Sequence, residues 1–190
     1  LQDCVARRDS ANGLDIVASL RYYWVTHGTT EGVRWLDQLL ATGEASRQTQ
    51  ASACFLRGWL SVIQADPAAA RPWLARSVEV ARESGQMRQL VESLAMSANV
   101  EHILGDAAGA TRLLNEAEAI TAGLGDYVAT IELIQAQAVN AFFTADIETA
   151  AAISSKGARL GREVGDLFVL GSMLRNLGTV ALMDGALDAA

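Results

Sequence analysis

The stretch MSANVEHILGDAAGA, from Met96 to Ala110, contains the pattern that decides the fold. It indicates the end of one helix, a Gly-Asp turn and the start of a second helix, because small and apolar residues recur at helical spacing on both sides of the turn. Self-similarity at a period of forty residues is typical of repeat proteins. The segments that align with it without gaps are LRGWLSVIQADPAAA (Leu56 to Ala70), AQAVNAFFTADIETA (Ala136 to Ala150) and NLGTVALMDGALDAA (Asn176 to Ala190).

Two positions of this repeat carry a small side chain in each copy. The first is Gly58, Ala98, Ala138 and Gly178, and the second, twelve residues later, is Ala70, Ala110, Ala150 and Ala190. We expect paired helices to approach each other most closely at these positions, because a larger side chain would push the two helix axes apart.

The ends of the predicted helices also repeat. Glycines that suit the left-handed backbone at a helix end are Gly85, Gly125 and Gly165. Aspartates that can cap the start of the following helix are Asp66, Asp106, Asp126, Asp146 and Asp166. Pro67 directly follows one of these caps, at a position where its missing N–H needs no partner. Each unit is therefore predicted to be two helices joined by short turns.

The whole chain is predicted to be all-α. The predicted helices span residues 1–7, 11–27, 31–42, 48–64, 67–84, 87–104, 107–124, 127–144, 147–164 and 167–183. Residues 1–190 then form a single α-solenoid domain, with units at 11–46, 47–86, 87–126, 127–166 and an incomplete 167–190. Since the chain begins at Leu1 and ends within a unit, we expect it to be a fragment of a larger protein whose open solenoid ends support a homodimer.

Composition argues against several classes of function. The net charge is −7 and the pI is near 4.8, so the surface repels nucleic acid and anionic lipid, and contact with either is not expected. No run of residues approaches the ~18 apolar residues of a membrane span. Cys4 and Cys54 lie far apart without metal-ligand spacing, which favours free thiols, no metal site and a cytoplasmic location.

No group of residues has the spacing of a catalytic site. GDAAGAT, Gly105 to Thr111, lacks the lysine and the preceding strand of a phosphate-binding loop. His27 and His102 stand at predicted helix ends without a nucleophile at motif spacing, which favours roles in capping or in a groove. We therefore predict that the chain is not an enzyme and holds no cofactor in this segment.

The spacing of the two small positions resembles that of the tetratricopeptide (TPR) repeat. Leu74 and Leu114 match the large apolar position of its second helix, whereas Ser154 departs from it. The forty-residue unit is also longer than the about 34 residues of that repeat. The resemblance implies a right-handed superhelix of antiparallel helix pairs, in which the first helix of each pair lines a concave face.

The same resemblance indicates which residues face that concave surface. Aromatic rings, amides and a few charges suit a small ligand or a peptide, because apolar surface supplies binding energy and polar groups set orientation. The alternative is that many of these side chains pack between repeats, particularly Trp59 and Phe142. The candidates are Tyr22, Phe55, Trp59, Glu92, Asn99, His102, Glu132, Gln135, Phe142, Arg175 and Thr179.

A more specific resemblance covers nearly the whole chain and is carried by YYWVTHGTTEGVRWLDQLL, residues 22–40, and LRNLGTVALMDGALDAA, residues 174–190. These segments resemble the helical-repeat arm of bacterial STAND-type signal-transduction ATPases related to the maltose-regulon activator, which often carry a LuxR-type DNA-binding domain. The resemblance implies an ATP-binding domain upstream, an output domain elsewhere, and an arm that receives a small inducer or a partner protein. The alternative is a spacer that transmits the state of the ATPase to the output domain without a groove ligand.

Overall fold

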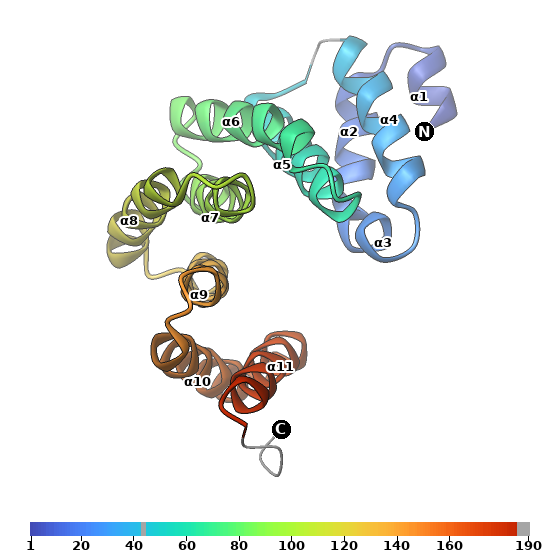
Figure 1. The fold of residues 1–190 in the computed structure, drawn as a ribbon. Coiled ribbons are helices and arrows are strands. Elements are labelled where there is room, and N and C mark those ends of the chain that lie inside the picture. The colour runs from blue at the N-terminus through green and yellow to red at the C-terminus, as the bar shows by residue number, and fades with distance from the viewer. Residues whose placement is uncertain (43–44, 186–190) are drawn as a thin grey trace.

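The computed structural model describes residues 1–42 and 45–185. Eleven helices and no strand occur in these two ranges, which confirms the all-α prediction (Figure 1). From α4 onward, each helix begins and ends within two residues of the range that the sequence predicts. The helices are α1 (Gln2–Ala6), α2 (Ser10–Ser19), α3 (Arg21–Thr26), α4 (Thr29–Thr42), α5 (Arg47–Ile63), α6 (Pro67–Glu83), α7 (Met87–Ile103), α8 (Ala107–Leu124), α9 (Tyr127–Phe143), α10 (Ile147–Val164) and α11 (Leu167–Met183).

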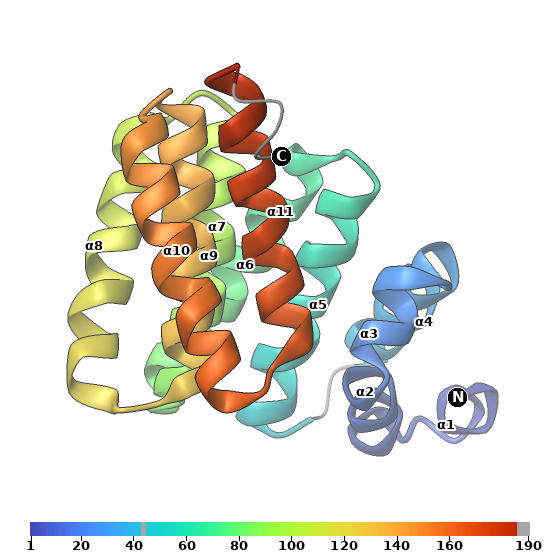
Figure 2. The ribbon, with the colours of Figure 1, turned by 90° about the horizontal axis from the view of Figure 1, so that it is seen from below.

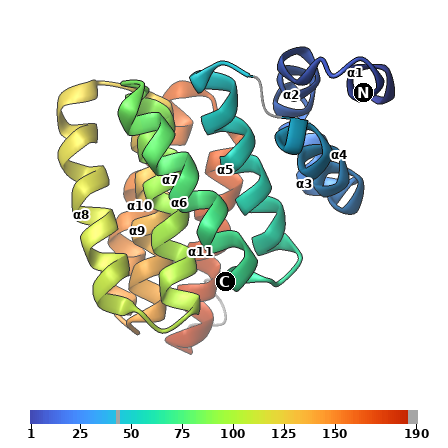
Figure 3. The same cartoon turned by 90° about the horizontal axis from the view of Figure 1, so that it is seen from above.

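Helices α5 to α11 follow one another along an arc. Consecutive helices α5 and α6, α7 and α8, and α9 and α10 pack as antiparallel pairs, and α7 contacts both α5 and α9 (Figure 2). Figure 1 shows α5, α7, α9 and α11 on the inner side of the arc and α6, α8 and α10 on its outer side. Figure 3 shows α1 to α4 as a separate group beside α5. The inner side therefore gathers the first helix of each pair.

Aspartate side chains begin the helices as the sequence predicts. The Asp126 carboxylate accepts a hydrogen bond from the backbone N–H of Ala129 at 2.9 Å. The first N–H groups of a helix have no partner within it, so each such cap fixes where a helix starts. The same bond is made by Asp66, Asp106, Asp146 and Asp166.

Left-handed residues end the helices. The predicted glycines have φ angles of 69°, 61° and 80° at Gly85, Gly125 and Gly165. The turn within each unit also contains a left-handed residue, and there Ala65 and Ala145 adopt φ of 59° and 57° at the position equivalent to Gly105. A left-handed backbone strains a residue that carries a Cβ, so the two alanines are less favourable than glycine at these turns.

The small positions of the repeat lie where helices approach closely. A Cβ added to Gly58 would lie 2.6 Å from Cγ of Leu74, so the contact between α5 and α6 excludes any larger residue there. Gly178 is only partly buried, and Ala190 lies outside the described residues. The alanines at the small positions that have no exposed surface are Ala70, Ala98, Ala110, Ala138 and Ala150.

The helix predicted over residues 11–27 is wrong, because the chain bends at Leu20 and forms two helices, α2 and α3. Leu20 has φ −96° and ψ 19°, outside the helical range. The bend lets the indole of Trp24 donate a hydrogen bond to the carbonyl of Val17 at 3.0 Å and bury itself against Leu14. Burial of this large ring offsets the cost of the helical hydrogen bonds that the bend breaks. The pattern of nearby residues in the sequence does not reveal this burial.

Helix α11 exposes a row of apolar side chains. The exposed fractions are 79% at Leu167, 70% at Phe168 and 57% at Leu182 and Met183. Association of two copies through this surface stays a prediction. Within the described ranges, no helix combines the length and the apolar character that crossing a bilayer requires.

Candidate ligand-binding site

Two cavities adjoin on the inner side of the arc. One has a volume of about 380 Å³ between α3, α9 and the start of α11, and the other, of about 180 Å³, extends to α5 and α7. The larger of the two has the size of a typical small-molecule site. Both are lined by Arg21, Tyr22, Glu132, Gln135 and Phe168.

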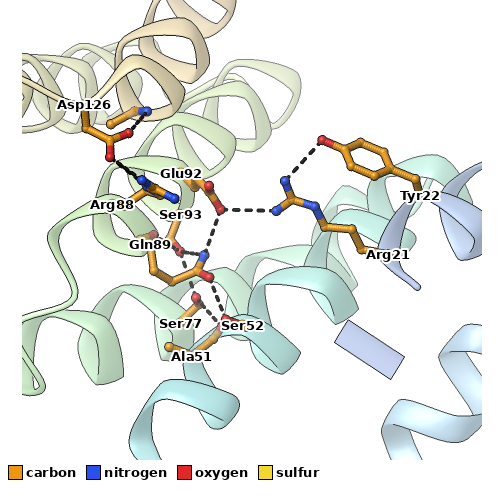
Figure 4. A network of polar contacts seen from close by, with 11 residues as sticks. Arg21, Tyr22, Ala51, Ser52, Ser77, Arg88, Gln89, Glu92, Ser93 and Asp126 are labelled. Atoms are coloured by element: carbon orange, nitrogen blue, oxygen red, sulfur yellow. Dashed lines mark hydrogen bonds and ion pairs between the residues drawn. The ribbon is translucent and has the colours of Figure 1, made fainter. Parts of the chain in front are cut away.

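Helical periodicity brings the lining residues together. Glu132 and Gln135 lie three residues apart on α9, and Phe55 and Trp59 lie four apart on α5, so each pair shares one face of its helix. The bend at Leu20 allows α3 to turn its first residues toward α7 and α9 (Figure 4). Helical spacing thus places each pair on one face of its helix, and the bend at Leu20 brings Arg21 and Tyr22 of α3 to the same site.

Aromatic rings form the wall between the two cavities. The centroid of the Tyr22 ring lies 6.3 Å from that of Trp59 and 6.2 Å from that of Phe168, in both cases edge to face. The Phe55 ring lies 5.8 Å from Trp59 and is itself buried. Tyr22 of α3 therefore contacts α5 at one end of the arc and α11 at the other.

A buried ion pair joins α3 to α7. Nη1 of Arg21 lies 3.6 Å from Oε2 of Glu92, whose side chain is only 6% exposed. The guanidinium also lies over the Tyr22 ring at 4.9 Å and donates to its hydroxyl at 3.1 Å (Figure 4). Burial raises the pKa of Glu92, while the charges of Arg21 and Arg88 act in the opposite direction.

A layer of hydrogen bonds beneath the cavities holds Glu92 in place. Ser52 donates to Oε1 of Gln89 at 2.9 Å, and the Gln89 amide donates to Oε2 of Glu92 at 3.4 Å. The hydroxyl of Ser93 continues this layer, since it lies 2.8 Å from that of Ser77 (Figure 4). Glu92 therefore has partners on both sides of Oε2, Gln89 on its own helix and Arg21 on α3.

Glu132 differs from Glu92 because its carboxylate makes no hydrogen bond or ion pair with the residues that the structure describes, although it lines both cavities. Burial raises the pKa of Glu132 to about 7, with a further increase from the charge of Glu92 and a decrease from Arg21. A carboxylate held in this way is available to a ligand.

Asn99 is a second group without a partner. Its Oδ1 atom is buried and accepts no hydrogen bond within residues 1–42 and 45–185, and the residue lines the smaller cavity. A buried acceptor without a donor costs about 1–3 kcal/mol.

The structure brings six of the eleven predicted site residues to these cavities: Tyr22, Phe55, Trp59, Asn99, Glu132 and Gln135. Glu92 lies beneath them in the ion pair with Arg21. His102 instead hydrogen-bonds Asn140 and stacks on Phe143, and Phe142 packs against the cluster of α9, α10 and α11. Arg175 and Thr179 are exposed farther along α11.

Sequence reasoning missed Arg21 and Phe168. Arg21 follows the unforeseen bend, and Phe168 belongs to the site only because α11 returns toward α3. The segment RYYW, residues 21–24, contains the one sequence feature that could have indicated Arg21, since an arginine beside two tyrosines and a tryptophan is typical of binding surfaces.

A larger cavity of about 850 Å³ lies between the α2 and α4 group and the pair α5 and α6. Its three arginines already have carboxylate partners: Nε of Arg57 lies 2.6 Å from Asp37, and Arg47 and Arg76 pair with Glu83 and Glu79. Because its charged groups are satisfied, this cavity is a weaker candidate than the inner pair.

Comparison with models of known protein families finds no family that matches the chain, and a search of curated proteins finds no match. Among the described residues, no cluster of three or more His, Cys, Asp or Glu side chains is arranged to hold a metal ion.

Proposed function

We propose that this chain is a TPR-like α-solenoid that binds a ligand on its concave face, the inner side of the arc, and that it acts as a sensor arm without catalysis. The antiparallel pairs and the stacking of α7 on α5 and α9 support this architecture. The observation that carries the proposal is the pair of adjoining cavities. Helices α3, α5, α7, α9 and α11 converge on them, and two polar groups there lack partners in the part of the chain that the structure describes.

The composition of the site favours binding over packing alone. Packing between repeats fills space and pairs polar atoms, whereas Glu132 and Asn99 are left for a ligand to satisfy. Aromatic surface with a few polar groups is the usual make-up of a small-molecule site. The role of the arm in a cytoplasmic bacterial transcription regulator, with ATP bound by another domain, rests on the family resemblance of the sequence.

The second candidate is a spacer that binds nothing in its groove. The observation that favours it is that His102 and Phe142, which were predicted to face the groove, instead make contacts between α7, α9, α10 and α11. In that case the arm transmits the state of one domain to another through these contacts.

Thermal melting with a panel of small metabolites and short peptides separates the two candidates. A ligand present at about one hundred times its Kd stabilises the folded chain by about 2.7 kcal/mol, so the melting temperature should rise by several degrees. The double variant Asn99→Ala and Glu132→Ala should lose that rise, whereas Glu118→Gln, at an exposed site on the outer helix α8, should keep it. A rise that survives in the double variant would show that the ligand binds elsewhere, and the absence of any rise would favour the spacer.

A further inference from the structure

We propose that the ligand of the concave face is a small organic cation, a protonated amine with an apolar body, bound by the Glu132 carboxylate between the two cavities. This inference rests on the proposed function, because it names the chemical class of the ligand at the same site.

The charges around the site are predominantly acidic. Arg88 donates through Nε to Asp126 at 2.9 Å and is thereby paired, and Arg21 is paired with Glu92. Asp166 accepts hydrogen bonds from the backbone N–H of Val169 and, at 3.5 Å, from the hydroxyl of Tyr127. The charged groups that line the two cavities are Arg21, Glu132 and Asp166, and the neighbouring ion pairs add Glu92, Arg88 and Asp126.

These groups comprise two cations and four carboxylates, which leaves a local excess of negative charge when all are ionised. Glu132 is the carboxylate without an ion pair or hydrogen bond in the described ranges. A protonated amine supplies the missing counter-charge and up to three N–H donors. An anion would instead share Arg21 with Glu92 and be repelled by Glu132, and a neutral ligand would leave the Glu132 charge without a counter-charge.

The rings around Glu132 suit the same class of ligand. Trp59 and Phe168 border the cavities that Glu132 lines, and aromatic faces attract cations. They also offer apolar surface to the body of the ligand. The Asn99 side chain also lines the smaller cavity and adds a polar group to its wall.

The size of the site favours a small molecule over a polymer. The larger cavity, of about 380 Å³, lies by itself in the usual range for small ligands. Contact between Tyr22 and Phe168 narrows the approach from the side of α3 and α11. The acidic chain as a whole, with a net charge of −7, also attracts cations.

Three matched probes test this inference by titration calorimetry at pH 8: 2-phenylethylamine, its neutral analogue 2-phenylethanol and the anion 3-phenylpropanoate. The amine should bind at least about tenfold more tightly than either analogue, because only the amine pairs with Glu132. Glu132→Gln should reduce amine affinity at least about tenfold, while the exposed control Glu118→Gln leaves it unchanged. The helical circular dichroism of each variant checks that it is folded.

The pH dependence provides a second readout. The amine stays protonated between pH 6 and pH 8, whereas a carboxyl group whose pKa is about 7 goes from mostly neutral to mostly charged. Amine affinity should therefore rise about tenfold over this range in the wild type and stay flat in Glu132→Gln.

The outcomes separate this inference from the function on which it rests. Equal or tighter binding of the alcohol or the anion, or full amine affinity in Glu132→Gln, overturns the cation assignment and leaves a ligand-binding groove in place. Failure of all three probes to bind at millimolar concentration overturns the cation assignment and also counts against the groove as a small-molecule site.

Discussion

Replacing Glu132 with glutamine should change how the stability of the chain depends on pH. Burial raises the pKa of Glu132 in the folded chain to about 7 from its ordinary value of 4.5. Between these two values the folded state binds more protons than the unfolded state, so the free energy of unfolding falls as pH rises. The stabilising proton is fully present below the unfolded pKa and is lost as pH rises through the folded pKa. Glutamine cannot titrate and removes this loss.

The magnitude follows from the two pKa values. A shift from 4.5 to about 7 corresponds to a loss of roughly 3 kcal/mol when complete, since each pKa unit is worth about 1.4 kcal/mol. Most of that loss, roughly 2 to 3 kcal/mol, falls between pH 5 and pH 8. The free energy of unfolding of Glu132→Gln, relative to the wild type, should therefore increase by this amount from pH 5 to pH 8.

Urea unfolding followed by helical circular dichroism at both pH values measures the difference. Glu118→Gln serves as the matched control, because it removes an exposed carboxylate and should show no such change. A gap between the Glu132→Gln variant and the wild type that is the same at pH 5 and pH 8 would refute the argument that Glu132 is buried without a partner.

Five further substitutions test the packing of the repeat by thermal and urea unfolding. Ser154→Ala should stabilise the chain by about 1 kcal/mol, because the Ser154 hydroxyl is buried without a partner in the described ranges. Ser77→Ala should destabilise the chain by a similar amount, because the Ser77 hydroxyl donates to the carbonyl of Ala51 at 2.8 Å. Ala145→Gly should stabilise the chain by roughly 0.5–1 kcal/mol by relieving a left-handed alanine, and lower stability would show that the turn is not strained. Ala110→Phe should destabilise the chain by about 1–3 kcal/mol or more, because that alanine is fully buried. Ala119→Ser, on the exposed face of α8, should have little effect. Equal melting temperatures of these two variants would contradict the assigned register of the repeat.

Much of the helical framework could be predicted because its signals are local. Aspartate caps, left-handed glycines and small residues at fixed spacing act within a few residues of their own position, and aspartates cap the starts of α6 and of α8 to α11. The bend at Leu20 could not be predicted in this way. Its cause is the burial of Trp24 against residues of α2, which offsets an uninterrupted helical pattern.

Part of the candidate site could also be predicted, because the repeat register is a local signal. The repeat register places Phe55, Trp59, Asn99, Glu132 and Gln135 on first helices, and those helices do line the inner side of the arc. The register could not distinguish residues that face a cavity from those, such as His102 and Phe142, that a neighbouring helix covers. That difference depends on how each pair of helices is rotated against the next.

The sequence by itself determined where helices α5 to α11 start and stop and where paired helices approach most closely, because capping, helical periodicity and the need for small side chains operate over short distances along the chain. Only the tertiary structure decided which carboxylate is free. The bend at Leu20 and the curvature of the arc bring Arg21 to Glu92 and leave Glu132 without an ion pair among the described residues. Such pairing across the arc depends on distances between helices remote in sequence, and it determines the charge that a ligand must carry.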